Sequence, residues 1–227
     1  MQLNRTISEQ PDHFIQSLFP QEVGSERLCP FVAPAQPEPV HQGAPPHVCK
    51  LGMIIFLISE ALLFSGLIAG YIVLRLAAPQ WPPSPELPAL PKVLTGCNTL
   101  VLIASSIAFH MVEVSVKKGK TGRRWLFLTI LLGSTFLCGQ AYEWTHLYHE
   151  GLWFHLGGVY GSSFFVMTGF HGAHVFIGVM LILWCFLRQC MFKSFSQNHH
   201  VALDNVGLYW HFVDVVWVFL YTILYLV

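Results

Sequence analysis

Several pairs of ionisable residues in the apolar part of this chain stand three positions apart. The pairs are His110–Glu113, Glu143–His146, His171–His174 and His211–Asp214. Residues three apart lie on one face of an α-helix, so the two side chains of each pair can act together. Carboxylate and imidazole groups in this arrangement are typical of metal sites and of proton-sharing pairs.

The spacing of the pairs does not favour a metal centre. Glu143–His146 is an E-x-x-H, but di-iron bundles need two such motifs and two further glutamates. A haem would need axial histidines from opposite sides, and neighbours on one helix, such as His171 and His174, do not provide them. The alternative is a set of hydrogen bonds between helices, each worth about 1 kcal/mol in a membrane. We therefore expect no metal and interhelical polar contacts, made by Glu143, His171, His174, His211 and Asp214.

Glu60 is an isolated acid within the apolar run 56–64, FLISEALLF, and has no charged residue within one helical turn. A charged side chain near the centre of a membrane helix costs about 3 kcal/mol on insertion scales. The sequence leaves two interpretations open. Glu60 is either a proton-linked or subunit-contacting carboxyl, or a neutral acid that hydrogen-bonds a neighbouring helix.

The elements that carry these residues are five long apolar stretches. They cover residues 51–76, 93–116, 125–147, 159–187 and 206–227. Each has about twenty residues or more, enough to cross about 30 Å of hydrocarbon at about 1.5 Å per residue. The sequence therefore predicts an all-α fold, an integral membrane bundle of five transmembrane helices.

Prolines divide the chain into two parts. All fourteen lie at or before position 91, in an N-terminal segment and in the loop around 79–91. Proline removes a backbone donor and interrupts helices. We therefore expect a polar, proline-rich arm over residues 1–49, with no signal peptide, and a membrane domain over residues 50–227.

The distribution of lysine and arginine predicts the orientation of the bundle. Five basic residues lie in 117–124, between the second and third helices, and Arg188 and Lys193 lie between the fourth and fifth. The loops 78–91 and 148–158 have none. Basic loops stay on the cytoplasmic side, so the N-terminus should be cytoplasmic and the C-terminus on the opposite side. At this boundary Arg188 either binds a lipid phosphate or simply extends to the interface.

Composition excludes other classes of function. Apolar residues make up 54% of the chain and charged residues only 11%, with a formal net charge of zero. Such a chain offers no basic surface for nucleic acid. No C-x-x-C motif is present, so the six cysteines indicate apolar packing rather than a zinc or redox site. Small residues four apart, such as Gly66 and Gly70, predict close approach of helices.

Several motifs of this chain resemble those of cytochrome c oxidase subunit III. They are GSSFFVMTGFHGAHVFIG at 161–178, YWHFVDVVW at 209–217, GMIIFLISE at 52–60, QAYEW at 140–144, FLRQ at 186–189 and NHH at 198–200. The resemblance spans roughly residues 50–227, and its two C-terminal motifs are long. The fuller family form has seven helices, and this chain resembles the shorter bacterial form with five.

The resemblance implies a supporting role in an aa3-type oxidase that reduces oxygen and pumps protons. The chain would hold no catalytic centre and no cofactor, because the partner subunits carry the haems and copper. It would pack on subunit I, share the complex with subunit II, and bind structural phospholipids. At matching positions, Glu60 would be the family's buried carboxyl and Arg188 would contact a lipid head group.

Alternatives remain at this stage. Cytochrome c would be the electron donor to the complex, whereas a quinol is the alternative, and the glutamate at position 60 favours the former. A stand-alone haem protein or a transporter is a further alternative, although we find no broken helices or inverted repeats of the kind that transporters show. The resemblance implies a bacterial plasma membrane or a cyanobacterial thylakoid membrane.

Overall fold

The computed structural model describes residues 46–83, 88, 90–154, 157–192 and 201–226. The chain divides into two compact units, Met1–Gly43 and Ala44–Val227, and the described residues all belong to the second. Most of the expected N-terminal arm, the 198–200 motif and Lys193 therefore lie outside the described residues.

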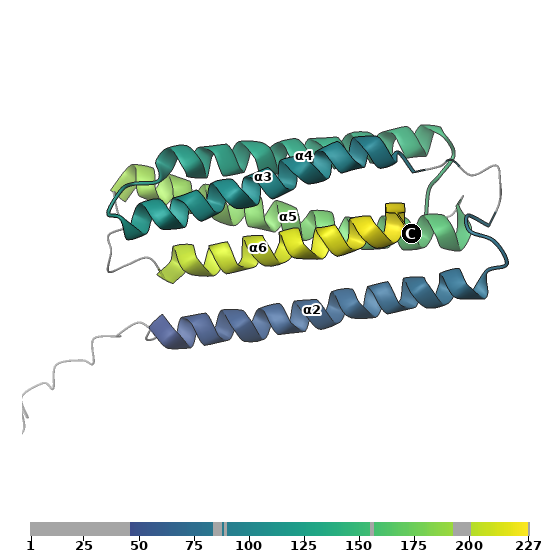
Figure 1. Ribbon diagram of the computed structural model, residues 1–227, viewed down its shortest axis with the longest axis horizontal. Helices are drawn as coiled ribbons and strands as arrows, with labels where there is room; N and C mark the ends of the chain where they lie inside the picture. Colours follow the sequence, from purple (N-terminus) through teal and green to yellow (C-terminus); the bar gives the residue numbers. More distant parts are fainter. Residues whose placement is uncertain (1–45, 84–87, 89, 155–156, 193–200, 227) are drawn as a thin grey trace, which may run out of the picture. The chain divides into compact units, whose positions relative to one another are not determined.

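Five long α-helices make up almost all of the described chain (Figure 1). They are α2 (Pro46–Ala77), α3 (Lys92–Lys117), α4 (Arg123–His149), α5 (Gly158–Phe192) and α6 (Val201–Tyr221), and the π-helical turn η1 (Thr222–Leu226) continues α6. Each is long and apolar enough to cross a membrane, and no strand occurs among the described residues. The predicted all-α membrane bundle is thus confirmed.

Glycines with positive φ form the short turns that reverse the chain. At the end of α3, the amide of Gly119 (φ 72°) donates to Val116 O, and that of Lys120 donates to Ser115 O. This left-handed glycine cap satisfies the last carbonyls of the helix. Gly151 (φ 87°) ends α4 in the same way, with the Leu152 amide donating to Leu147 O.

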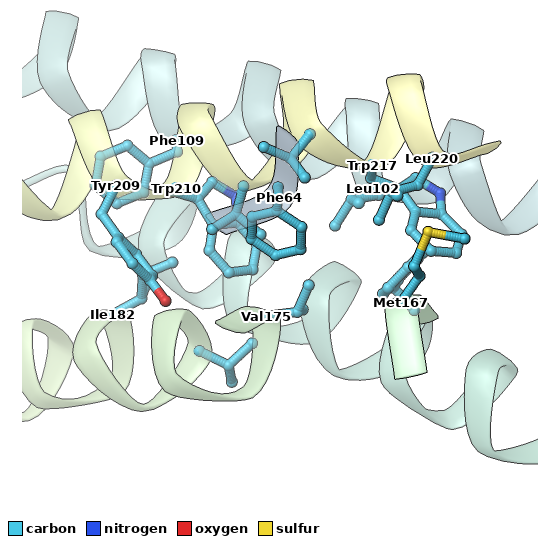
Figure 2. Close-up of a cluster of buried hydrophobic side chains, with 14 of the residues drawn as sticks. Phe64, Leu102, Phe109, Met167, Val175, Ile182, Tyr209, Trp210, Trp217 and Leu220 are labelled. Atoms are coloured by element: carbon cyan, nitrogen blue, oxygen red, sulfur yellow. The ribbon is translucent and has the colours of Figure 1, made fainter. Parts of the chain in front are cut away.

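Helix α6 lies at the centre of the bundle, in contact with α2, α3 and α5. Helix α4 covers α3 and α5, whereas α2 packs mainly on α5 and α6. The core contains large side chains from every helix, among them Phe64, Phe109, Met167, Trp210 and Trp217 (Figure 2). Because α2 touches two helices on one side only, most of its large apolar side chains are exposed.

Two indole groups on α6 fasten it to α3. The Trp210 N–H donates to Ser105 Oγ at 3.2 Å, and the Trp217 N–H donates to Thr99 Oγ1 at 2.9 Å. Each hydroxyl donates its own proton to a carbonyl of α3, Leu102 O or Thr95 O, and so has a lone pair free to accept the indole proton. These four polar side chains are thus paired inside the bundle without any charge.

Close helix approach occurs at some glycines of the bundle and not at others. A Cβ at Gly178 would lie 2.7 Å from the Trp210 ring, and one at Gly133 would lie 2.9 Å from the other edge of that ring. By contrast, a Cβ at Gly66 or Gly70 would meet nothing within 4 Å. The prediction of close packing at Gly66 and Gly70 is therefore wrong for this chain's own helices. Both glycines line a groove instead.

Candidate functional site

Glu60 on α2 and His174 on α5 face each other across the helix boundary. Glu60 Oε2 lies 3.0 Å from His174 Nε2, and the two side chains are 16% and 14% exposed. The residues are 114 positions apart in the chain. The structure thus gives the isolated acid an imidazole partner, which the spacing of residues within one helix did not reveal.

The geometry of His174 indicates where the protons of the pair lie. Its Nδ1 lies 2.6 Å from Phe170 O, and because a carbonyl oxygen only accepts hydrogen bonds, Nδ1 must carry a proton. One further proton then lies between Nε2 and Glu60 Oε2. Either a carboxylic acid donates to a neutral imidazole, or an imidazolium donates to a carboxylate, and the net charge is zero in both forms.

Aromatic rings surround the pair and hold it in place. The Phe64 ring meets the His174 ring edge-on at a centroid distance of 5.1 Å. The Tyr209 hydroxyl donates to His174 O at 3.0 Å, and its ring stacks on Phe56. Helices α2, α5 and α6 all contribute to this enclosure, so the position of the shared proton depends on how the three helices pack.

His171 lies one turn from His174 but points into the bundle core. Its ring is 1% exposed and stacks on Trp217 at 4.7 Å, with Phe136 meeting it edge-on. Neither ring nitrogen has a hydrogen-bond partner among the described residues. The two histidines therefore occupy different environments, one aromatic and one paired with an acid.

His211 and Asp214 on α6 are also separate from each other. His211 Nδ1 lies 2.6 Å from Ser106 Oγ on α3, and its ring meets Phe109 edge-on. Asp214 is 5% exposed, and its oxygens form no hydrogen bond with the described residues, although Ser106 lies nearby. His211 thus contacts a neighbouring helix, whereas Asp214 is buried on α6 with Ser106 nearby.

Comparisons with known proteins decide the family. The model of the family described as cytochrome c oxidase subunit III matches residues 35–227. The chain belongs to this family. It is 41% identical over 188 residues to the cytochrome c oxidase subunit 3 of Thermostichus vulcanus, covering 82% of this chain and 90% of the relative.

Other relatives have the same description. The cytochrome c oxidase subunit 3 of Synechocystis is 37% identical over 188 residues, which are 82% of this chain and 78% of the relative. That of Hippopotamus amphibius is 43% identical over 183 residues, which are 78% of this chain and 68% of the relative. Membership of the subunit III family makes this chain a multi-pass membrane subunit of a haem–copper oxidase in the respiratory chain.

The subunit III motif at 140–144 places Glu143 at a second interhelical contact. Glu143 is 1% exposed, and Tyr225 of η1 donates its hydroxyl proton to Glu143 Oε1 at 2.7 Å. The Gln140 amide donates to the other carboxylate oxygen at 3.3 Å. His146 turns away and lies 3.5 Å from Glu150, so the E-x-x-H residues do not converge. Tyr225 lies outside the sequence motifs, so the sequence did not predict its hydrogen bond to Glu143.

The described part of this subunit III chain offers no cluster for a metal ion. No group of three or more His, Cys, Asp or Glu side chains converges within it. Glu143, His174 and His211 instead contact individual side chains of other elements, and His171 stacks on Trp217.

Two further features lie on the surface of this subunit III chain, an exposed arginine and an apolar groove. Arg188 is exposed near the end of α5, and its guanidinium lies over the Trp184 ring at 5.2 Å. A groove of about 810 Å³ lies between α2 and α5. Its lining is mostly apolar and includes Gly66, Gly70 and Met167, together with Ser162 and Ser163.

Proposed function

We propose that this chain is the non-catalytic subunit III of an aa3-type, proton-pumping cytochrome c oxidase. Its role is to support proton uptake and to stabilise the catalytic subunit, which carries the haems and copper. Family membership supports the oxidase, and the separate partners of the polar side chains support the absence of a catalytic centre. The chain itself binds neither haem nor copper.

The single observation that carries the proton-linked role is the Glu60–His174 pair. A proton between two groups of this kind moves by a small shift within one hydrogen bond, at constant net charge. The site lies between α2 and the rest of the bundle. A subunit that packs on α2 is therefore close enough to respond to the electric field of the pair. Glu60 is therefore the proton-linked carboxyl, and His174 holds its orientation.

Helix α2 is the surface that best fits the catalytic subunit. It packs mainly on two helices of this chain and leaves large apolar side chains such as Ile55, Ile58 and Leu62 uncovered. Subunit I covers this face in the complex, and subunit II and the electron donor cytochrome c belong to the same assembly. The quinol alternative is tested by supplying the purified complex with reduced cytochrome c or with a quinol.

Phospholipids fill the remaining apolar surface. Arg188 contacts a lipid head group, and the groove between α2 and α5 takes an acyl chain. Exposure of the guanidinium and the apolar lining of the groove support these two assignments. The N-terminus is cytoplasmic, and the membrane is a bacterial plasma membrane or a thylakoid membrane, as the relatives from cyanobacteria favour.

The test is a Glu60→Ala oxidase complex, purified and compared with a Glu150→Ala complex as control. Glu150 is an acid outside the core that lies beside His146. We expect Glu60→Ala to assemble normally but to take up protons more slowly, or to lose activity sooner during turnover. Glu150→Ala should match the wild type. Normal proton uptake and normal turnover lifetime in Glu60→Ala would contradict the role.

A further inference from the structure

The turn between α3 and α4 forms a strongly basic concave surface. A cavity of about 700 Å³ lies there, lined by Ser115, Gly119, Lys120, Thr121, Gly122, Arg123, Arg124 and Trp125. Three of these side chains are cationic and none is acidic. The sequence has no Asp or Glu from residue 114 to residue 142, so no carboxylate of this segment neutralises the cavity.

Two contacts hold this turn against α5. The Gln189 amide donates to Thr121 O, and Arg123 Nη2 donates to Cys190 Sγ at 2.9 Å. Gln189 is 3% exposed, so the first contact is buried. The cavity is therefore a fixed part of the fold, with one guanidinium already positioned by a neighbouring helix.

The depth of the cavity matches that of phospholipid head groups. Helix α3 ends at Lys117 and α4 begins at Arg123, so the turn lies where two membrane spans end. The indole of Trp125 is 40% exposed at the first turn of α4, and tryptophan is enriched at this level of the bilayer. The first turn of α4 contains no acid and no side-chain cap, so its amides add to the positive potential.

The acidic side chains near the turn, on α3 and α6, do not line the cavity. Glu113 lies 3.6 Å from His110, and its carboxylate packs so closely on Gly207 of α6 that an added Cβ would clash with it. Asp204 lies in the first turn of α6 and does not line the cavity. The cations of the cavity therefore face outward without a carboxylate among its lining residues.

We propose that this cavity is a binding site for the head group of an anionic phospholipid. Arg124 and Lys120 bind the phosphate, and Arg123 of α4 supports it from its position against Cys190 of α5. Basic clusters at the cytoplasmic end of membrane helices attract anionic lipids by about 1 kcal/mol per cation, which is about fivefold in affinity. The site is separate from Arg188 and from the α2–α5 groove.

The test is a lipid titration of the delipidated oxidase complex, followed by native mass spectrometry. Phosphatidylglycerol and phosphatidylcholine are titrated separately, and the apparent Kd of the tightest phosphatidylglycerol is measured. We expect the K120Q/R124Q complex to bind phosphatidylglycerol about 25-fold more weakly, at about fivefold per charge. The K117Q/K118Q complex loses the same charge from residues outside the cavity lining, and its affinity should fall less than threefold. If K120Q/R124Q does not assemble, R124Q alone is measured, with an expected loss of about fivefold.

Four outcomes would overturn the proposal. Equal losses in the two double variants mean a diffuse attraction without a site. Equal binding of both lipids by the wild type means that the anionic head group is not recognised. Competition by excess inorganic phosphate means a site for a free anion, and loss of a neighbouring subunit from K120Q/R124Q means a protein interface. None of these readouts depends on Glu60, so the role in proton uptake is tested independently.

Discussion

At the scale of single residues, the Glu60–His174 hydrogen bond depends most on the tertiary structure, because its two members come from different helices. Each side chain alone would be an unpaired polar group in an apolar layer, which is costly. Together they satisfy each other, and Phe170 O satisfies the remaining nitrogen of His174. The stability of the pair is therefore expected to depend on both members at once.

A double-mutant cycle measures this dependence. Glu60→Gln, His174→Asn and the double variant are compared with the wild type by detergent-induced unfolding of the purified chain. We expect a coupling energy of about 1 to 2 kcal/mol, near the upper end for hydrogen bonds in membrane proteins. A control cycle between Glu60 and His110, which pairs with Glu113 instead, should show no coupling. Additive effects in the first cycle would mean that the two side chains do not share a proton.

The sequence predicted which residues carry polar groups into the bundle, but not their partners. Within one helix the spacing of side chains is fixed, so His171 and His174 were correctly placed as neighbours on α5. Whether one of them meets an acid and the other an indole depends on the rotation of α5 relative to α2 and α6. That rotation is set by the packing of side chains such as Phe64 and Trp217, which a single helix does not encode.

At the scale of elements, the glycines of α4 and α5 set the distance between helices. Gly178→Ala would place a methyl group 2.7 Å from the Trp210 ring and force α5 and α6 apart. We expect a loss of about 1 to 3 kcal/mol in the free energy of unfolding, as for other overpacked cores. Unfolding of the purified chain in detergent measures it.

Gly70→Ala is the matched control for this substitution. Its added methyl group would meet nothing within 4 Å, and alanine favours a helix over glycine by about 1 kcal/mol. The purified chain should therefore be unchanged or slightly more stable. Equal destabilisation by both variants would mean that glycine flexibility, rather than packing against Trp210, determines the stability of these helices.

The helix boundaries show where hydropathy alone is insufficient. Helices α3 and α4 begin and end within two residues of the predicted positions, because basic residues and glycines mark their ends. Helix α6 begins at Val201, five residues before the predicted start, since its first two turns are held by tertiary contacts. Leu203 is 1% exposed, and the Asn205 amide donates to Cys49 O on α2. The π-helical turn η1 had no sequence indication, and Tyr225 within it is fixed by Glu143.

At the scale of the whole molecule, the bundle is asymmetric in both packing and charge. Packing is dense around α6 and sparse around α2, which is the property expected of a subunit that completes its core with another chain or with lipid. Basic residues are concentrated at one end of the bundle, in the α3–α4 turn and near Arg188. The exposed apolar side chains of α2 predict which side faces a partner, and the basic loops predict which end lies in the cytoplasm.

Labelling of single cysteines tests this orientation. In a background with all six native cysteines replaced, Lys118→Cys reports on the α3–α4 turn and Glu150→Cys on the α4–α5 turn, and both positions are exposed. A membrane-impermeant maleimide should label Glu150→Cys in intact cells or right-side-out vesicles, and Lys118→Cys only after the membrane is opened or inverted. Because the two turns lie at opposite ends of α4, the pattern must be reciprocal if the helix crosses the membrane. The reverse pattern would place the basic turn outside and contradict the positive-inside argument, and labelling of both positions in sealed vesicles would mean that α4 does not span.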